Sequence, residues 1–181
     1  LIVLVLANAL VWYAVFREDR HGMLTVSFLD VGQGDSIFID TPNGNQILLD
    51  GGPDKKVLRA LSGVMPFYDR EIDMLALSHS HVDHFTGFVD VLNRYSVSGF
   101  MSSGTKVQTP EYFALRSYLD VSQPSSNYLE VGPPSGIKEI IAKRGMTVDL
   151  GDDVYLDVLL PTGDATNLPP HDGMMVTRLR Y

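Results

Sequence analysis

The feature that most constrains this chain is a short apolar segment, Ile72–Leu77, followed at once by the ligand-type side chains His79, His81, Asp83 and His84. Such an apolar run is typical of a central strand that is buried on both faces. Where the strand emerges, an extended chain points side chains two residues apart the same way, so the first three are expected to project to one side. His84 then lies at the turn into the next helix and approaches from another angle.

These four side chains favour metal binding. Imidazole and carboxylate are ligands for zinc and similar divalent metals, and four of them in one loop exceed what a single metal needs from local sequence. A pair of metals, each taking two of these residues, explains the cluster. The alternative is a run of surface histidines with Asp83 as a helix N-cap. That interpretation would suit a single histidine, but it does not explain the full string of four residues.

The surrounding pattern predicts an α/β (α+β) fold in which helices cover a sheet. Asn43-Gly44 favours a hairpin turn between two of the strands. Thr109-Pro110-Glu111 is typical of a helix start. The expected strands are 24–29, 36–41, 46–49, 72–77, 154–160 and 174–181, and the expected helices are 55–64, 86–95, one from Pro110, and 137–144.

Two further segments are candidates for the same cleft. Asp50 ends an apolar strand, so its carboxylate can reach the edge that carries the histidines; the alternative is an ordinary Asp-Gly turn. The loop of Gly32, Gln33, Gly34 and Asp35 resembles a phosphate-binding loop, but a strand follows it where such a loop requires a helix. The sequence therefore predicts no nucleotide cofactor, and a tight turn beside the cleft.

Composition limits the partners. With 181 residues the chain accommodates one domain and an appendage. Its 14 basic against 22 acidic residues exclude a broad basic footprint for nucleic acid, although metals can make one cleft locally positive. Cysteine is absent, so disulfides and thiolate ligands are excluded.

The first residues predict a membrane anchor. Residues 1–16 are uncharged and apolar, and 17–22 form a charged juxtamembrane linker. The run is shorter than the ~20 residues that span a bilayer, but Trp12 and Tyr13 near its charged end fit an interfacial aromatic belt. A signal peptide around Ala7-Asn8-Ala9 and a buried core helix are the alternatives. The sequence does not decide on which side of the membrane the following domain lies.

Three stretches resemble a known family. "SHSHVDHFTGF" at 78–88 matches the His-x-His-x-Asp-His signature of the metallo-β-lactamase superfamily. "LDVGQGDSIFI" at 29–39 and "ILLDGGP" at 47–53 are similar to the opening of the hydrolase domain of ComEC-type competence proteins, which are bacterial membrane proteins of DNA uptake. The resemblance implies the N-terminal part of an αββα sandwich with a binuclear zinc site at the rim of its two sheets. The membrane anchor expected at 1–16 would precede it as a transmembrane helix.

The resemblance also implies roles. His79 and His81 would bind the first metal, Asp83 and His84 the second, and Asp50 would orient a ligand. Zinc is expected, with manganese as the alternative, and Asp83 would also orient the attacking water. The implied activity is hydrolysis of phosphodiesters in nucleic acid at a bacterial cell membrane, with the domain on the extracytoplasmic side. Two alternatives stay open: a non-catalytic domain that guides DNA, and a hydrolase of small esters or lactams.

The ligand set is expected to be incomplete within residues 23–181, the hydrolase-like domain. Each metal would receive two ligands, whereas zinc normally takes four. His21 lies beside the apolar run and is a poor candidate. Asp164 resembles the family's bridging acid, but it follows Pro161 and precedes the stretch "MMVTRLRY", which in the family comes before that acid. His171 lies in a polar turn. The remaining ligands are therefore expected after Tyr181, and the oligomeric state is left open.

Overall fold

The computed structural model describes residues 1–18, 22–119 and 137–181. Its helices are α1 (Ile2–Glu18), α2 (Lys56–Leu61), α3 (Val82–Leu92) and α4 (Pro110–Leu119). Its strands are β1 (Thr25–Phe28), β2 (Ile37–Asp40), β3 (Gln46–Leu49), β4 (Glu71–Leu77), β5 (Ser96–Ser102), β6 (Lys138–Ile141), β7 (Thr147–Asp149), β8 (Tyr155–Leu160) and β9 (Val176–Arg180).

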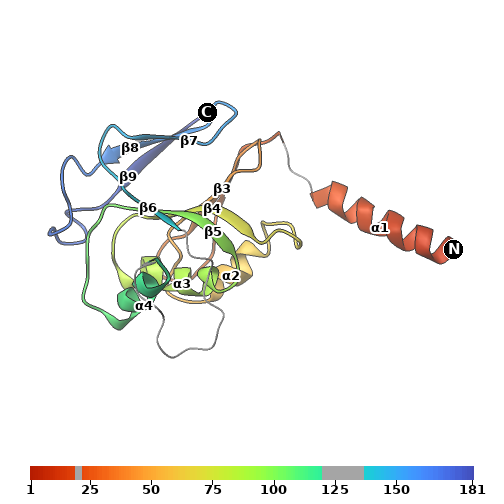
Figure 1. Ribbon diagram of the computed structural model, residues 1–181, viewed down its shortest axis with the longest axis horizontal. Helices are drawn as coiled ribbons and strands as arrows, with labels where there is room; N and C mark the ends of the chain where they lie inside the picture. The colour runs from red at the N-terminus through yellow and green to blue at the C-terminus, as the bar shows by residue number, and fades with distance from the viewer. Residues whose placement is uncertain (19–21, 120–136) are drawn as a thin grey trace.

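Two sheets and one layer of helices form the body of the molecule (Figure 1). Six strands make the larger sheet in the order β1-β2-β3-β4-β5-β6, antiparallel from β1 to β3 and parallel from β3 to β6. β7, β8 and β9 make a smaller antiparallel sheet. Helices α2, α3 and α4 lie on one side of the large sheet and the small sheet on the other. Within the described ranges, no helix covers the outer face of the small sheet.

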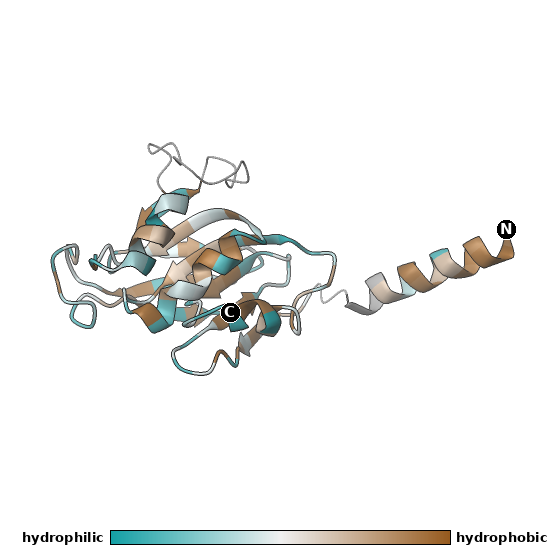
Figure 2. Cartoon of the chain, turned by 90° about the horizontal axis from the view of Figure 1, so that it is seen from below, coloured by the Kyte–Doolittle hydropathy of each residue, from teal (hydrophilic) through white to brown (hydrophobic). Residues whose placement is uncertain are grey.

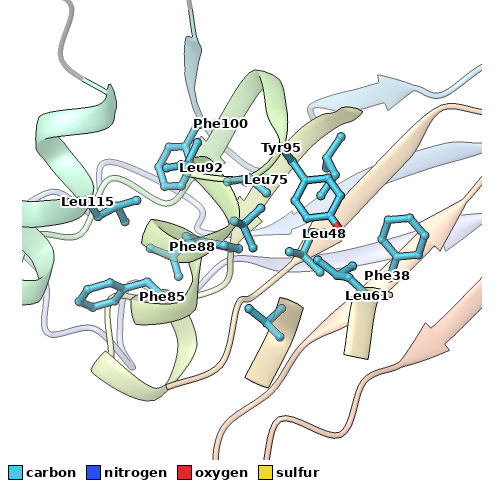
Figure 3. Close-up of a cluster of buried hydrophobic side chains, with 14 of the residues drawn as sticks. Phe38, Leu48, Leu61, Leu75, Phe85, Phe88, Leu92, Tyr95, Phe100 and Leu115 are labelled. Carbon is cyan, nitrogen blue, oxygen red and sulfur yellow. The ribbon is translucent and has the colours of Figure 1, made fainter. Parts of the chain in front are cut away.

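The large sheet separates two apolar cores because its side chains alternate between its faces. Leu48, Leu75 and Phe100 face the helices and pack with Phe85 and Phe88 of α3 (Figure 3). The next residues along β4 and β5, Ala76 and Met101, face the small sheet, together with Ile47 of β3. The strand expected at 72–77 is therefore central and buried on both faces, as predicted, and the strand expected at 46–49 lies beside it.

The structure corrects three local expectations. α3 begins at Val82 rather than at 86, so Asp83 lies in the first turn of a helix and not in an extended segment. Residues 138–141 form the edge strand β6, paired in parallel with β5, where an amphipathic helix was expected. The β-branched isoleucines of this segment suit a strand, and pairing with β5 overrides a periodicity that fits either structure. β5 and β7 were not predicted.

The N-terminal segment is a separate helix. α1 extends away from the body and is mostly apolar, apart from Asn8 and the charged pair Arg17 and Glu18 at its end (Figure 2). The side chains at its start are largely exposed, Leu1 by 96% and Leu4 by 73%. In the part of the chain that the structure describes, no helix combines the length and hydropathy required to cross a bilayer. Residues 19–21 of the expected linker, including His21, lie outside the described residues.

Candidate metal centre

The candidate site lies where parallel strands end. β3 leads into Asp50, β4 leads into Ser78 and the histidines, and β5 leads into Ser103 and Thr105. Because parallel strands carry their carboxyl ends to the same edge, these segments meet there. The edge also receives the segment before β9, because the backbone N–H of Met175 donates a hydrogen bond of 2.7 Å to the carbonyl oxygen of Ser78.

Three histidines form the first group of potential ligands. One ring nitrogen from each of His79, His81 and His171 lies within 4.8 Å of the others. The ring centroids of His171 lie 5.0 Å from His79 and 4.3 Å from His81. Sequence reasoning had expected the missing histidine after Tyr181, yet the fold supplies one from the turn at 171. The only feature of the sequence that could have pointed to His171 as a ligand is that it shortly precedes a strand.

Asp50 connects the histidines through hydrogen bonds. Its side chain is 3% exposed and accepts from the backbone N–H of Ser78 at 2.8 Å and from the Ser78 hydroxyl at 2.6 Å. The second oxygen also lies 2.8 Å from Nδ1 of His84. The expected approach of Asp50 to the histidines is therefore observed.

This network sets which ring nitrogen carries the proton. A carboxylate only accepts, so Nδ1–H of His84 is the donor to Asp50. The single hydroxyl proton of Ser78 goes to Asp50, so the 2.9 Å contact between Ser78 Oγ and His79 Nδ1 has the imidazole as donor. In both histidines Nε2 keeps its lone pair, which is the form that binds a metal.

A second group combines Asp35, Asp50 and His84, whose ligand atoms also lie within 4.8 Å of one another. Asp35 reaches this group from the turn of Gly32, Gln33 and Gly34, which is close to α3 because a Cβ at Gly34 would collide with the carbonyl of Asp83. The loop proposed to border the cleft therefore does so. Asp83 itself, half-buried in the first turn of α3, belongs to neither group.

The pKa shifts of two histidines follow from these surroundings. Burial lowers the pKa of His79, and the adjacent His84 adds to the effect, so the ring is favoured in its neutral form. The hydrogen bond to Asp50 raises the pKa of His84, which outweighs the effect of burial. A proton on His84 would compete with a metal, whereas His79 is prepared to bind one.

Asp164, which resembles the family's bridging acid, lies elsewhere. Its carboxylate accepts from the backbone N–H and the hydroxyl of Thr166, at 2.9 and 2.6 Å. These contacts lower the pKa of Asp164. The carboxylate belongs to neither of the two groups, so it serves a local turn.

The donor set fits a divalent metal. Three imidazoles whose ring nitrogens converge within 4.8 Å correspond to a catalytic zinc site with an open fourth position. The second group fits less completely, because Asp50 is already engaged by Ser78 and His84. There, Nε2 of His84 and the carboxylate of Asp35 are the atoms that remain for a metal.

Comparison with known proteins agrees with this arrangement. Residues 29–179 match the model of the metallo-beta-lactamase superfamily. Ribonuclease Z of Aeropyrum pernix is 32% identical over 114 residues, which cover 56% of this chain and 36% of that protein. Among solved structures, BJP-1, a subclass B3 metallo-beta-lactamase of Bradyrhizobium japonicum, has a TM-score of 0.55 at 16% identity, over 88% of this chain and 55% of that one.

A motif mutant of a metallo-beta-lactamase from Cronobacter sakazakii gives a TM-score of 0.54 at 19% identity, over 85% of this chain and 56% of that one. The chain spans little more than half the length of these solved structures and about a third of the ribonuclease. The structural likenesses show the fold, and the family model covers most of the chain. Because the family model covers residues 29–179, the chain belongs to the metallo-beta-lactamase superfamily.

Proposed function

We propose that this chain carries the metal site of a hydrolase that cleaves phosphodiester bonds in nucleic acid. The observation that carries the proposal is the convergence of His79, His81 and His171 into one group with the geometry of a metal site. Similarity to a ribonuclease Z favours a phosphodiester over a lactam, because that relative has a higher sequence identity than the lactamases listed above.

In this proposal, His79, His81 and His171 hold one zinc ion, and His84 with Asp35 or Asp83 holds a second. Zinc supplies a bound water that ionises near neutral pH and a positive charge that polarises the phosphoryl oxygen. Asp50 would hold the single proton of each neutral ring, His79 through Ser78 and His84 directly, on Nδ1, so that Nε2 is the atom that faces a metal. Asp83, at the positive N-terminal end of α3, orients the attacking water and accepts its proton.

We expect His171→Ala in the full-length protein to lose bound zinc and to lower hydrolysis of bis(p-nitrophenyl) phosphate and single-stranded DNA by about a hundredfold or more, because a three-histidine site loses one ligand. Zinc content by emission spectrometry and initial rates measure both effects. His21→Ala is the matched control. Metal-independent hydrolysis, or hydrolysis of nitrocefin alone, would contradict the proposal, and the absence of any hydrolysis would favour a DNA-guiding domain.

We propose further that α1 anchors the domain in a bacterial cell membrane, with the hydrolase body outside the cytoplasm in a machinery for DNA uptake. The support is that α1 has apolar side chains on every face, an arrangement found in helices surrounded by lipid or by a protein core. Replacing Leu4 and Leu10 together by Asp should shift the protein out of the membrane fraction on sedimentation. An unchanged distribution would exclude the anchor.

A further inference from the structure

A cavity of about 470 Å³ lies beyond the carboxyl end of β5. It is formed by the loop after β5, one face of α4, and the edge strand β6. The lining residues used below are Lys106, Tyr112, Phe113, Arg116, Glu139 and Thr166. We propose that this cavity binds one nucleotide of the nucleic-acid substrate, next to the bond that is cut; the inference rests on the proposed phosphodiesterase function.

The cavity and the candidate metal centre share one wall. Ser80, which lies between His79 and His81, donates its hydroxyl to the backbone carbonyl of Thr105 at 2.7 Å. Thr105 also fills the space opposite Gly173, where a Cβ would collide with its methyl group. The next residue, Lys106, lines the cavity. A chain bound at the metals would therefore continue into this cavity over a single loop.

The walls offer the three contacts that a nucleotide needs. The ring of Phe113 is 56% exposed and gives a face on which a base can stack. Arg116 and Glu139 form an ion pair of 2.6 Å in the wall of the cavity, where the other guanidinium N–H groups and the second carboxylate oxygen can meet the hydrogen-bonding edge of a base. The exposed ammonium group of Lys106 suits a phosphate.

Thr166 lies in the wall of the cavity opposite the loop after β5, and its contacts with Asp164 are separate from the metal site. Thr166 is fixed by two hydrogen bonds to Asp164 and turns its hydroxyl side toward the cavity loop, where a Cβ at Gly104 would lie 3.6 Å from Thr166 Oγ1. In a chain with a net charge of −8, the cavity has two cations, Lys106 and Arg116, against one anion, Glu139, which is paired with Arg116. An aromatic face beside two cations favours a nucleotide over an apolar ligand.

The test is calorimetric titration of the full-length protein with adenosine 5′-monophosphate, which is not a phosphodiester. We expect saturable binding that Phe113→Ala weakens about tenfold, because stacking of one base on an aromatic ring stabilises binding on this scale. Lys106→Ala should weaken the same binding. Phe67→Ala removes a similarly exposed phenylalanine outside the cavity and should leave the affinity unchanged.

Inorganic phosphate distinguishes this cavity from binding at the metals, because its affinity should not depend on Phe113. Absence of saturable nucleotide binding, or equal affinity in the wild type, Phe113→Ala and Lys106→Ala, would overturn the inference. Hydrolysis of bis(p-nitrophenyl) phosphate by the wild type is measured in parallel. If that activity is present while nucleotide binding is independent of Phe113, the cavity assignment fails and the phosphodiesterase proposal stands. If that activity is absent while nucleotide binding depends on Phe113, the cavity binds a nucleotide and the phosphodiesterase proposal fails.

Discussion

At the scale of single residues, Asp50 determines the state of two histidines that lie in different ligand groups. Its backbone has a φ of +59°, a left-handed conformation that Asp and Asn adopt more readily than other non-glycine residues. The side chain accepts from Ser78 and His84 while its main chain turns toward Gly51. Position 50 therefore demands both an unusual backbone and an acceptor that never donates.

Asp50→Asn separates these two demands. Asparagine keeps the backbone conformation, but its amide nitrogen donates to Ser78 and His84. The Ser78 hydroxyl then turns to His79 Nδ1, and in both histidines the proton moves to Nε2, where it blocks the metal. We expect zinc affinity to fall about 10- to 100-fold with little change in circular dichroism, measured by competition with a chromogenic chelator.

The control for this substitution is Asp54→Asn. Asp54 also accepts a backbone N–H, from Lys56 at 2.8 Å, but belongs to neither ligand group. Its substitution should leave zinc affinity as it is. Equal affinities in Asp50→Asn and the wild type would show that the carboxylate does not set the tautomers.

The ligand string could be read from the sequence because it is local. His79, His81 and His84 follow a recognisable buried strand, and Asp50 follows another strand of the same sheet. His171 could not be assigned, because its approach depends on how the small sheet packs against the large one. The group around His84 also differs from the expectation: it contains Asp35 and Asp50, whereas Asp83, which was expected to share a metal with His84, belongs to neither group.

At the scale of elements, the position of α3 fixes His84 relative to the strand ends. The backbone N–H of Gly51 donates to the carbonyl of His84 at 2.6 Å, and that of Gly87 donates to the carbonyl of Gly52 at 3.0 Å. The helix approaches so closely that a Cβ at Gly87 would collide with the Gly51 carbonyl. Glycine at 87 thus permits the contact that holds the second ligand group together.

Gly87→Ala should destabilise the protein by about 1–3 kcal/mol, because the added methyl group forces α3 away from the loop at 51–54. Denaturant unfolding followed by circular dichroism measures this change. Gly163→Ala is the control, since a Cβ there meets no atom within 4 Å. A stability loss of equal size in both variants would show that the close approach of α3 is not the cause.

Helices and strands whose sequence fits one secondary structure could be predicted, whereas segments whose sequence fits either a helix or a strand could not. α4 begins at Pro110 as expected, and the backbone N–H of Tyr112 donates to the Thr109 hydroxyl at 3.2 Å. The segment at 138–141 has isoleucines that suit either a helix face or an edge strand, and only pairing with β5 decides between them. β5 itself contains serines and a glycine, and its burial comes from its neighbours in the sheet.

At the scale of the molecule, the candidate metal centre exists only in the folded chain. Its ligands come from the turn at Asp35, the end of β3, the segment at 79–84 and the turn at His171. An unfolded chain does not hold these segments together, so a divalent metal would bind the native state preferentially. Metal binding is therefore expected to act as a stabilising link between the large sheet and the segment that leads into the small one.

Zinc should raise the melting temperature of the protein, and chelation should lower it. At a free zinc concentration a hundredfold above Kd, one site adds about 2.7 kcal/mol to the free energy of unfolding. Differential scanning calorimetry measures the shift. His171→Ala should reduce it and His21→Ala should not. A shift of the same size in both variants would mean that the stabilising metal is bound elsewhere.

The alternating faces of the large sheet have a consequence for how the sequence can vary. Leu75 and Ala76 are neighbours in the chain, but one packs with α3 and the other with the small sheet. A substitution at either residue therefore disturbs a different set of side-chain partners. Substitutions can therefore change the packing of one core without touching the side chains of the other. The strand ends between the two cores keep the same chemical groups in place.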